Sequence, residues 1–117
     1  MLILFWLLVG HALADFALQS EWMAKAKNRN SGTTLSYIPP GQTPQIVWPF
    51  VLSAHALIHG GVVAVATGIW WLGALETGAH WAIDFGKCEN HYGIYADQAL
   101  HVGCKVLWLF LAVRASG

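Results

Sequence analysis

Residues 46–67, IVWPFVLSAHALIHGGVVAVAT, carry the pattern that decides the fold class of this chain. The segment is long and apolar enough to cross a bilayer as a helix, which takes about 20 residues. It nevertheless contains two ionisable side chains, His55 and His59, four positions apart. Residues at this interval lie on nearly the same face of an α-helix. The segment is therefore predicted to be a membrane-spanning helix with one polar stripe.

Three further apolar segments repeat this pattern, so that four spans are predicted, at about 2–22, 46–67, 69–85 and 94–113. Ionisable groups within a bilayer cost on the order of 3 kcal/mol each, and they normally face the protein interior. The polar stripes therefore predict one buried polar centre inside a four-helix bundle. The polar residues of the other three spans are His11, Asp15 and Gln19, then Glu76, His80 and Asp84, then Asp97, Gln98, His101 and Lys105.

The composition agrees with a membrane protein. Of the 117 residues, 56% are hydrophobic and only 10% are charged, whereas soluble domains have roughly 25% charged residues. The net charge is zero and no basic stripe is present, so the expected partner is the lipid bilayer and not a nucleic acid. Cys88 and Cys104 are expected to be free thiols. The whole chain, 1–117, is predicted to be a single all-α transmembrane domain.

The basic residues predict the orientation of the spans. Three of them fall within 25–29, directly after the first span, and Lys87 ends the third span, whereas Arg114 stands at the opposite side. The positive-inside rule places the basic side in the cytoplasm. We therefore expect an antiparallel, up-down-up-down bundle with both termini outside. The polar loop 28–45 would lie on the cytoplasmic side.

Four motifs carry a resemblance to a known family. They are HALADFALQ at 11–19, HALIH at 55–59, HWAIDFGK at 80–87 and DQALH at 97–101. In this order they resemble the DUF3307 family of bacterial and phage membrane proteins, whose function is unknown. The resemblance implies a small multi-pass protein of the bacterial inner (cytoplasmic) membrane, and it implies no activity. The loop 28–45 is longer than expected for that family.

The charges of the predicted centre indicate a bound cation. The spans contain four carboxylates against a single cation, Lys105, which leaves an excess of three negative charges if the histidines are neutral. A low-dielectric interior does not tolerate such an excess, so a metal ion, protonated histidines or protonated carboxylates must offset it. Imidazole and carboxylate groups are ligands of Zn and Fe, and helical bundles hold such ions between facing helices.

The predicted metal ligands are His55, His59, His80, Asp84, Asp97 and His101. The residues expected to support these ligands or to relay protons are His11, Asp15, Gln19, Glu76, Gln98 and Lys105, and Asp15 is also a candidate ligand. An ion with an open position could activate water for a membrane metal-dependent hydrolase. A proton or ion relay stays open as an alternative. So does a structural subunit of a homo-oligomer or a larger complex associated with haem, pigment or quinone.

Overall fold

The computed structural model describes residues 2–31, 39–43 and 46–117, and residues 32–38 and 44–45 of the predicted loop lie outside these ranges. All regular structure in the described part is helical, which confirms the all-α prediction for those residues. In chain order the elements are α1 (Leu2–Ala12), the π-helix η1 (Leu13–Ala17), α2 (Glu21–Ala26), the 3-10 helix η2 (Arg29–Ser31), α3 (Trp48–Thr67), α4 (Trp70–Cys88) and α5 (Ile94–Ser116).

The first predicted segment, 2–22, is not one continuous α-helix. After α1 the backbone widens into η1, where the N–H of Leu18 donates to the C=O of Leu13, five residues back, at 2.7 Å. Short π-helical stretches of this kind occur frequently at functional sites. Asp15, the acidic residue of the first motif, lies within η1. Hydrophobic periodicity alone gives no signal for such a local change in helix type.

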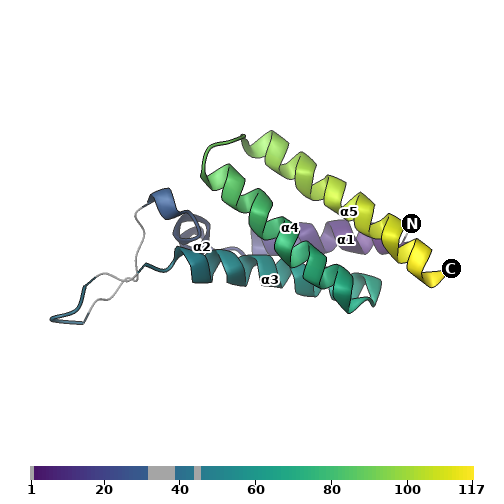
Figure 1. The fold of residues 1–117 in the computed structure, drawn as a ribbon, viewed down its shortest axis with the longest axis horizontal. Coiled ribbons are helices and arrows are strands. Elements are labelled where there is room, and N and C mark those ends of the chain that lie inside the picture. The colour runs from purple at the N-terminus through teal and green to yellow at the C-terminus, as the bar shows by residue number, and fades with distance from the viewer. Residues whose placement is uncertain (1, 32–38, 44–45) are drawn as a thin grey trace.

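The chain leaves η1 through an extended residue and then starts a short separate helix. Ser20 has extended backbone angles, and its hydroxyl accepts a hydrogen bond from the N–H of Met23 at 3.1 Å. A serine in this position satisfies one of the free N–H groups at a helix start. α2 therefore begins as an independent element, lying at the end of the molecule away from both termini (Figure 1).

A close approach of two glycines fixes the contact between α3 and α4. A Cβ atom added to Gly60 would lie 2.5 Å from the carbonyl oxygen of Gly73, and one added to Gly73 would lie 2.5 Å from the carbonyl oxygen of Gly60. Only residues without a side chain permit this spacing of the two backbones. The connection between the helices also depends on glycine, because Gly68 ends α3 in the left-handed region with φ of 73°.

An apolar core lies at the end of the molecule where both termini are found (Figure 1). Its buried members come from α1, α3, α4 and α5, and none of them is ionisable. They are Leu7, Val63, Leu72, Trp108 and Ala112.

Large apolar side chains also cover the outside of the molecule. Phe50 is 76% exposed, Val65 87% and Trp70 78%. Two helices of the described chain, α3 and α5, are long and apolar enough to cross a membrane, and the stretch Leu2–Ala17 is apolar but shorter. The core helices of soluble proteins meet the same criteria, so helix length and composition are weak support for a membrane by themselves.

Candidate metal centre

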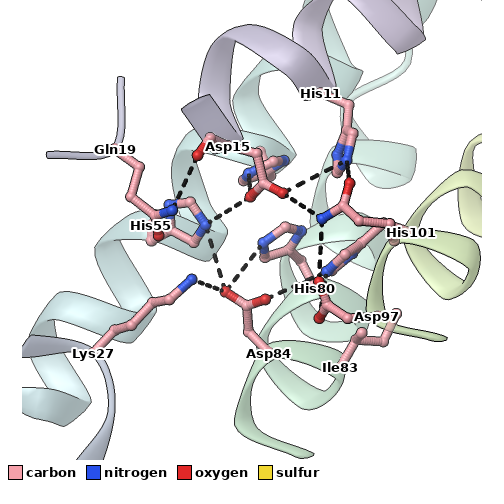
Figure 2. A network of polar contacts seen from close by, with 12 residues as sticks. His11, Asp15, Gln19, Lys27, His55, His80, Ile83, Asp84, Asp97 and His101 are labelled. Carbon is pink, nitrogen blue, oxygen red and sulfur yellow. Dashed lines mark hydrogen bonds and ion pairs between the residues drawn. The ribbon is translucent and has the colours of Figure 1, made fainter. Parts of the chain in front are cut away.

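The polar stripes of the helices converge on one buried cluster (Figure 2). Five histidines of the described chain are buried, and they lie among four carboxylates and two lysines that are also 9% exposed or less. Carboxylates and lysines are almost never fully buried unless they are paired. The members are His11, Asp15, Lys27, His55, His59, Glu76, His80, Asp84, Asp97, His101 and Lys105.

Asp15 is the carboxylate at the centre of the first group of ligands. Its Oδ1 atom lies 3.3 Å from Nε2 of His55 and 3.2 Å from Nε2 of His59. These two histidines are one turn apart on α3, whereas Asp15 is presented by η1. Together with His80 of α4 they offer four ligand atoms that all lie within 4.8 Å of one another. This group has the donor types and the compactness of a transition-metal site.

A second group lies at the start of α5. Nε2 of His101 is 3.3 Å from Oδ1 of Asp84 and 3.3 Å from Oδ1 of Asp97. The three ligand atoms again lie within 4.8 Å of one another. Asp97 and His101 are one turn apart on α5, and Asp84 reaches them from α4.

Glu76 holds the cluster on the side of the apolar core. Its Oε1 atom accepts a hydrogen bond from Nζ of Lys105 at 2.6 Å and lies 3.3 Å from Nδ1 of His80. Its other oxygen accepts from the indole N–H of Trp108. A third group of candidate ligands, Glu76, His80 and His101, overlaps the first two. Because Lys105 and Trp108 already engage both oxygens, Glu76 is better suited to orient His80 than to ligate an ion.

Gln98 connects the first helix with the fifth. Its amide nitrogen donates to Oδ2 of Asp15 at 2.9 Å and to Oδ2 of Asp97 at 3.2 Å. Its amide oxygen lies 3.0 Å from Nε2 of His11. Gln19 has a different role, since its side chain donates to the backbone carbonyl of Asp15 at 3.0 Å and so supports η1. Of these three polar side chains, His11 belongs to the cluster and Gln98 contacts it, whereas Gln19 stabilises the backbone beside it.

The DUF3307 family model matches residues 3–116, nearly the whole chain. The chain belongs to the DUF3307 family. This result confirms the family suggested by the four motifs, and the family is described as one of unknown function. Neither a curated protein nor a solved structure gave a match. The chemistry of this DUF3307 protein must therefore be inferred from the centre itself.

Several polar atoms of the DUF3307 centre have no hydrogen-bond partner among the described residues. They include both ring nitrogens of His55 and of His59, Nε2 of His80, and Oδ1 of Asp97. The nitrogens that face Asp15 are close to its oxygen but are not directed at it as hydrogen-bond donors. A buried polar atom without a partner costs about 1–3 kcal/mol. Imidazole nitrogens gathered around a carboxylate in this way fit a shared metal ion, and the donor set fits Zn or Fe.

Lys105 is the cation that the predicted spans contribute, but the buried centre holds a second one from outside them. Lys27, expected in the cytoplasmic loop, is 5% exposed, and its Nζ atom donates to Oδ2 of Asp84 at 2.6 Å. Four carboxylates against two lysines leave an excess of two negative charges if the histidines are neutral, instead of three. No feature of the sequence indicated this role, because Lys27 stands in a basic run typical of a loop. Trp108 was also missed, although it continues the face that carries His101 and Lys105.

Contacts at the surface explain how Lys27 reaches the centre. Arg29 forms an ion pair with Glu89, and the side-chain amide of Asn30 donates to the backbone carbonyl of Cys88 at 3.0 Å. These contacts attach η2 to the end of α4. The hydrogen bond and the charge of Arg29 lower the pKa of Glu89, so that Glu89 stays ionised. The attachment places Lys27 beside Asp84, as Figure 2 shows.

Proposed function

We propose that this protein is an integral membrane protein that binds a transition metal, Zn or Fe, at the buried His/Asp centre. The observation that carries the proposal is the first group of ligands. Asp15, His55, His59 and His80 offer four ligand atoms within 4.8 Å of one another, and the three histidines are at most 1% exposed. Their Nε2 atoms lack hydrogen-bond partners among the described residues. A divalent ion would also neutralise the excess of two negative charges.

The apolar outer surface of the molecule supports the membrane part of the proposal. The exposed surface of α3 and α5 is rich in large apolar side chains, and both helices are long enough to span. We infer four antiparallel spans in one domain, formed by α1 with η1, α3, α4 and α5. We place them in the bacterial inner membrane with both termini outside. The centre would then lie in the cytoplasmic half, since the loop-side residues of each span supply it.

Hydrolysis of a lipid-linked or amphipathic substrate is the reaction that this placement favours. A metal ion in a buried centre can lower the pKa of bound water to about 7 and so supply a nucleophile at neutral pH. We place the entrance to such a centre on the polar loop side, because the apolar core formed by Leu7, Val63, Leu72, Trp108 and Ala112 closes the other end. A relay, the alternative function, needs polar groups or water across the whole bilayer.

The metal content of the purified protein tests the proposal. The full chain, expressed in metal-replete medium and purified in detergent, should retain at least about one equivalent of Zn or Fe after mild chelation. His59→Ala should lose most of that metal. His91→Ala is the matched control, because His91 is an exposed histidine in the link between α4 and α5. Wild-type protein with less than about a tenth of an equivalent would contradict metal binding and favour the relay.

A further inference from the structure

The carboxylate of Asp84, a member of the second group of ligands, also contacts histidines of the first group. Its Oδ2 atom is 3.5 Å from Nε2 of His55 and 3.5 Å from Nε2 of His80. Its Oδ1 atom faces the other way and is 3.3 Å from Nε2 of His101. Figure 2 shows the carboxylate with histidines around it and the Lys27 amine to its left. One carboxylate therefore contacts imidazoles of three helices through two different oxygen atoms.

The first and second groups of ligands share no residue, although the third group takes His80 from one and His101 from the other. The first consists of Asp15, His55, His59 and His80, and the second of Asp84, Asp97 and His101, with no residue in common. Each contains a buried atom that lacks a hydrogen-bond partner among the described residues. In the first this is Nε2 of each of the three histidines, and in the second it is Oδ1 of Asp97.

We propose that the centre holds two divalent metal ions bridged by the carboxylate of Asp84, an inference that rests on the proposed metal binding. The first ion is held by the Asp15 group and by Oδ2 of Asp84. The second is held by Oδ1 of Asp84 together with Asp97 and His101. Helical bundles build paired sites of this kind from carboxylates and histidines on facing helices. Lys27 donates to the bridging carboxylate and fixes its orientation, as hydrogen-bonded groups around metal ligands do.

The net charge of the centre indicates which kind of ligand it binds. The four carboxylates and two lysines sum to two negative charges, so one divalent ion gives neutrality and a second leaves two positive charges. A buried net charge requires compensation. The second ion has only three protein donors, which leaves positions for an exogenous ligand. The loaded centre therefore binds an anion, and a phosphate group matches both the charge and the oxygen donors that paired ions clamp.

Metal stoichiometry of the full chain in detergent tests the two-ion centre. Metal-free protein titrated with Zn should take up two equivalents, and Asp97→Asn and His101→Ala should each take up one. His91→Ala, the control outside the centre, should take up two. One equivalent in the wild type would overturn the second ion and leave metal binding intact. No uptake in the wild type would overturn both proposals.

The Asp84 bridge and the binding of an anion can each be tested in the wild-type protein. Neither test requires that a variant fold. Loading with Mn²⁺ should give the electron paramagnetic resonance spectrum of a magnetically coupled pair, and Asp84→Asn should abolish the coupling. Two uncoupled ions in the wild type would overturn the Asp84 bridge.

Calorimetric titration with inorganic phosphate should show binding to the two-Zn form and none to metal-free protein. Two bound Zn ions without phosphate binding would overturn the anionic ligand.

Discussion

Lys27 and Asp84 form a buried ion pair, with Nζ 2.6 Å from Oδ2 and exposures of 5% and 2%. The two residues are 57 positions apart in the chain. The pair joins the segment after α2 to the middle of the polar centre. Lys27 also places a positive charge beside the Asp84 carboxylate, which three histidines contact.

Replacing Lys27 should destabilise the metal-free protein strongly. Lys27→Met leaves the carboxylate of Asp84 buried without its cation, and removing one partner of a buried pair costs about 3–5 kcal/mol. Lys25→Met is the matched control, because Lys25 and its partner Glu21 are 63% and 84% exposed. An exposed pair contributes about 0–1 kcal/mol. The free energy of unfolding in detergent measures both, and equal losses would contradict the buried pair.

The close contact between α3 and α4 predicts a difference between two glycines of the same helix. Gly73→Ala places a Cβ atom 2.5 Å from the carbonyl oxygen of Gly60, and the resulting overpacking should cost about 1–3 kcal/mol. Gly78→Ala meets nothing within 4 Å and should stabilise α4 by about 0.5–1 kcal/mol. Thermal unfolding of the two variants should move in opposite directions. A similar shift for both would show that the helices separate freely at this contact.

Acid should release the metal. An imidazole must be neutral to ligate an ion, so protons compete with the metal for His55, His59, His80 and His101. Metal retained by the wild type should therefore fall as the pH of the dialysis buffer is lowered from about 7.5 to about 5. The metal-dependent gain in melting temperature should disappear over the same range, because a ligand that binds only the folded state stabilises it. Retention independent of pH would argue against histidine ligands.

The apolar core predicts that the protein does not conduct protons. The buried side chains of Leu7, Val63, Leu72 and Ala112 carry no polar group and lie between the centre and the end that holds the termini. A conducting path must cross about 30 Å of hydrocarbon. Liposomes containing the protein should show no proton flux above empty liposomes under a pH gradient. A flux that Asp15→Asn abolishes would instead make the buried carboxylates a relay.

Cysteine labelling tests the orientation in the membrane. In a background with Cys88 and Cys104 replaced by alanine, Ser116→Cys should react with a membrane-impermeant thiol reagent in intact cells. Gln42→Cys should react only after lysis if the basic side of the protein faces the cytoplasm, as we propose. The two positions serve as controls for each other. Labelling of both from one side would refute an antiparallel arrangement with external termini.

The sequence by itself determined the helical class. It also determined which polar residues share one face of a helix. Helical periodicity is local, so an interval of four was sufficient to place His55 with His59, and Asp97 with His101, on single faces. The low share of charged residues required these stripes to face inward in any membrane protein. The same argument failed at 2–22, where the π-helix and the Ser20 helix start depend on local hydrogen bonds that hydrophobicity does not report.

Only the tertiary structure decided how the stripes meet. Asp84 contacts His55, His80 and His101 because α3, α4 and α5 pack at particular rotations, and no spacing within one helix contains that information. In the sequence Lys27 resembles a loop residue, and only the contacts of η2 with the end of α4 bring it beside Asp84. Contacts between helices arise from packing across the whole molecule, whereas the sequence pattern describes one helix at a time.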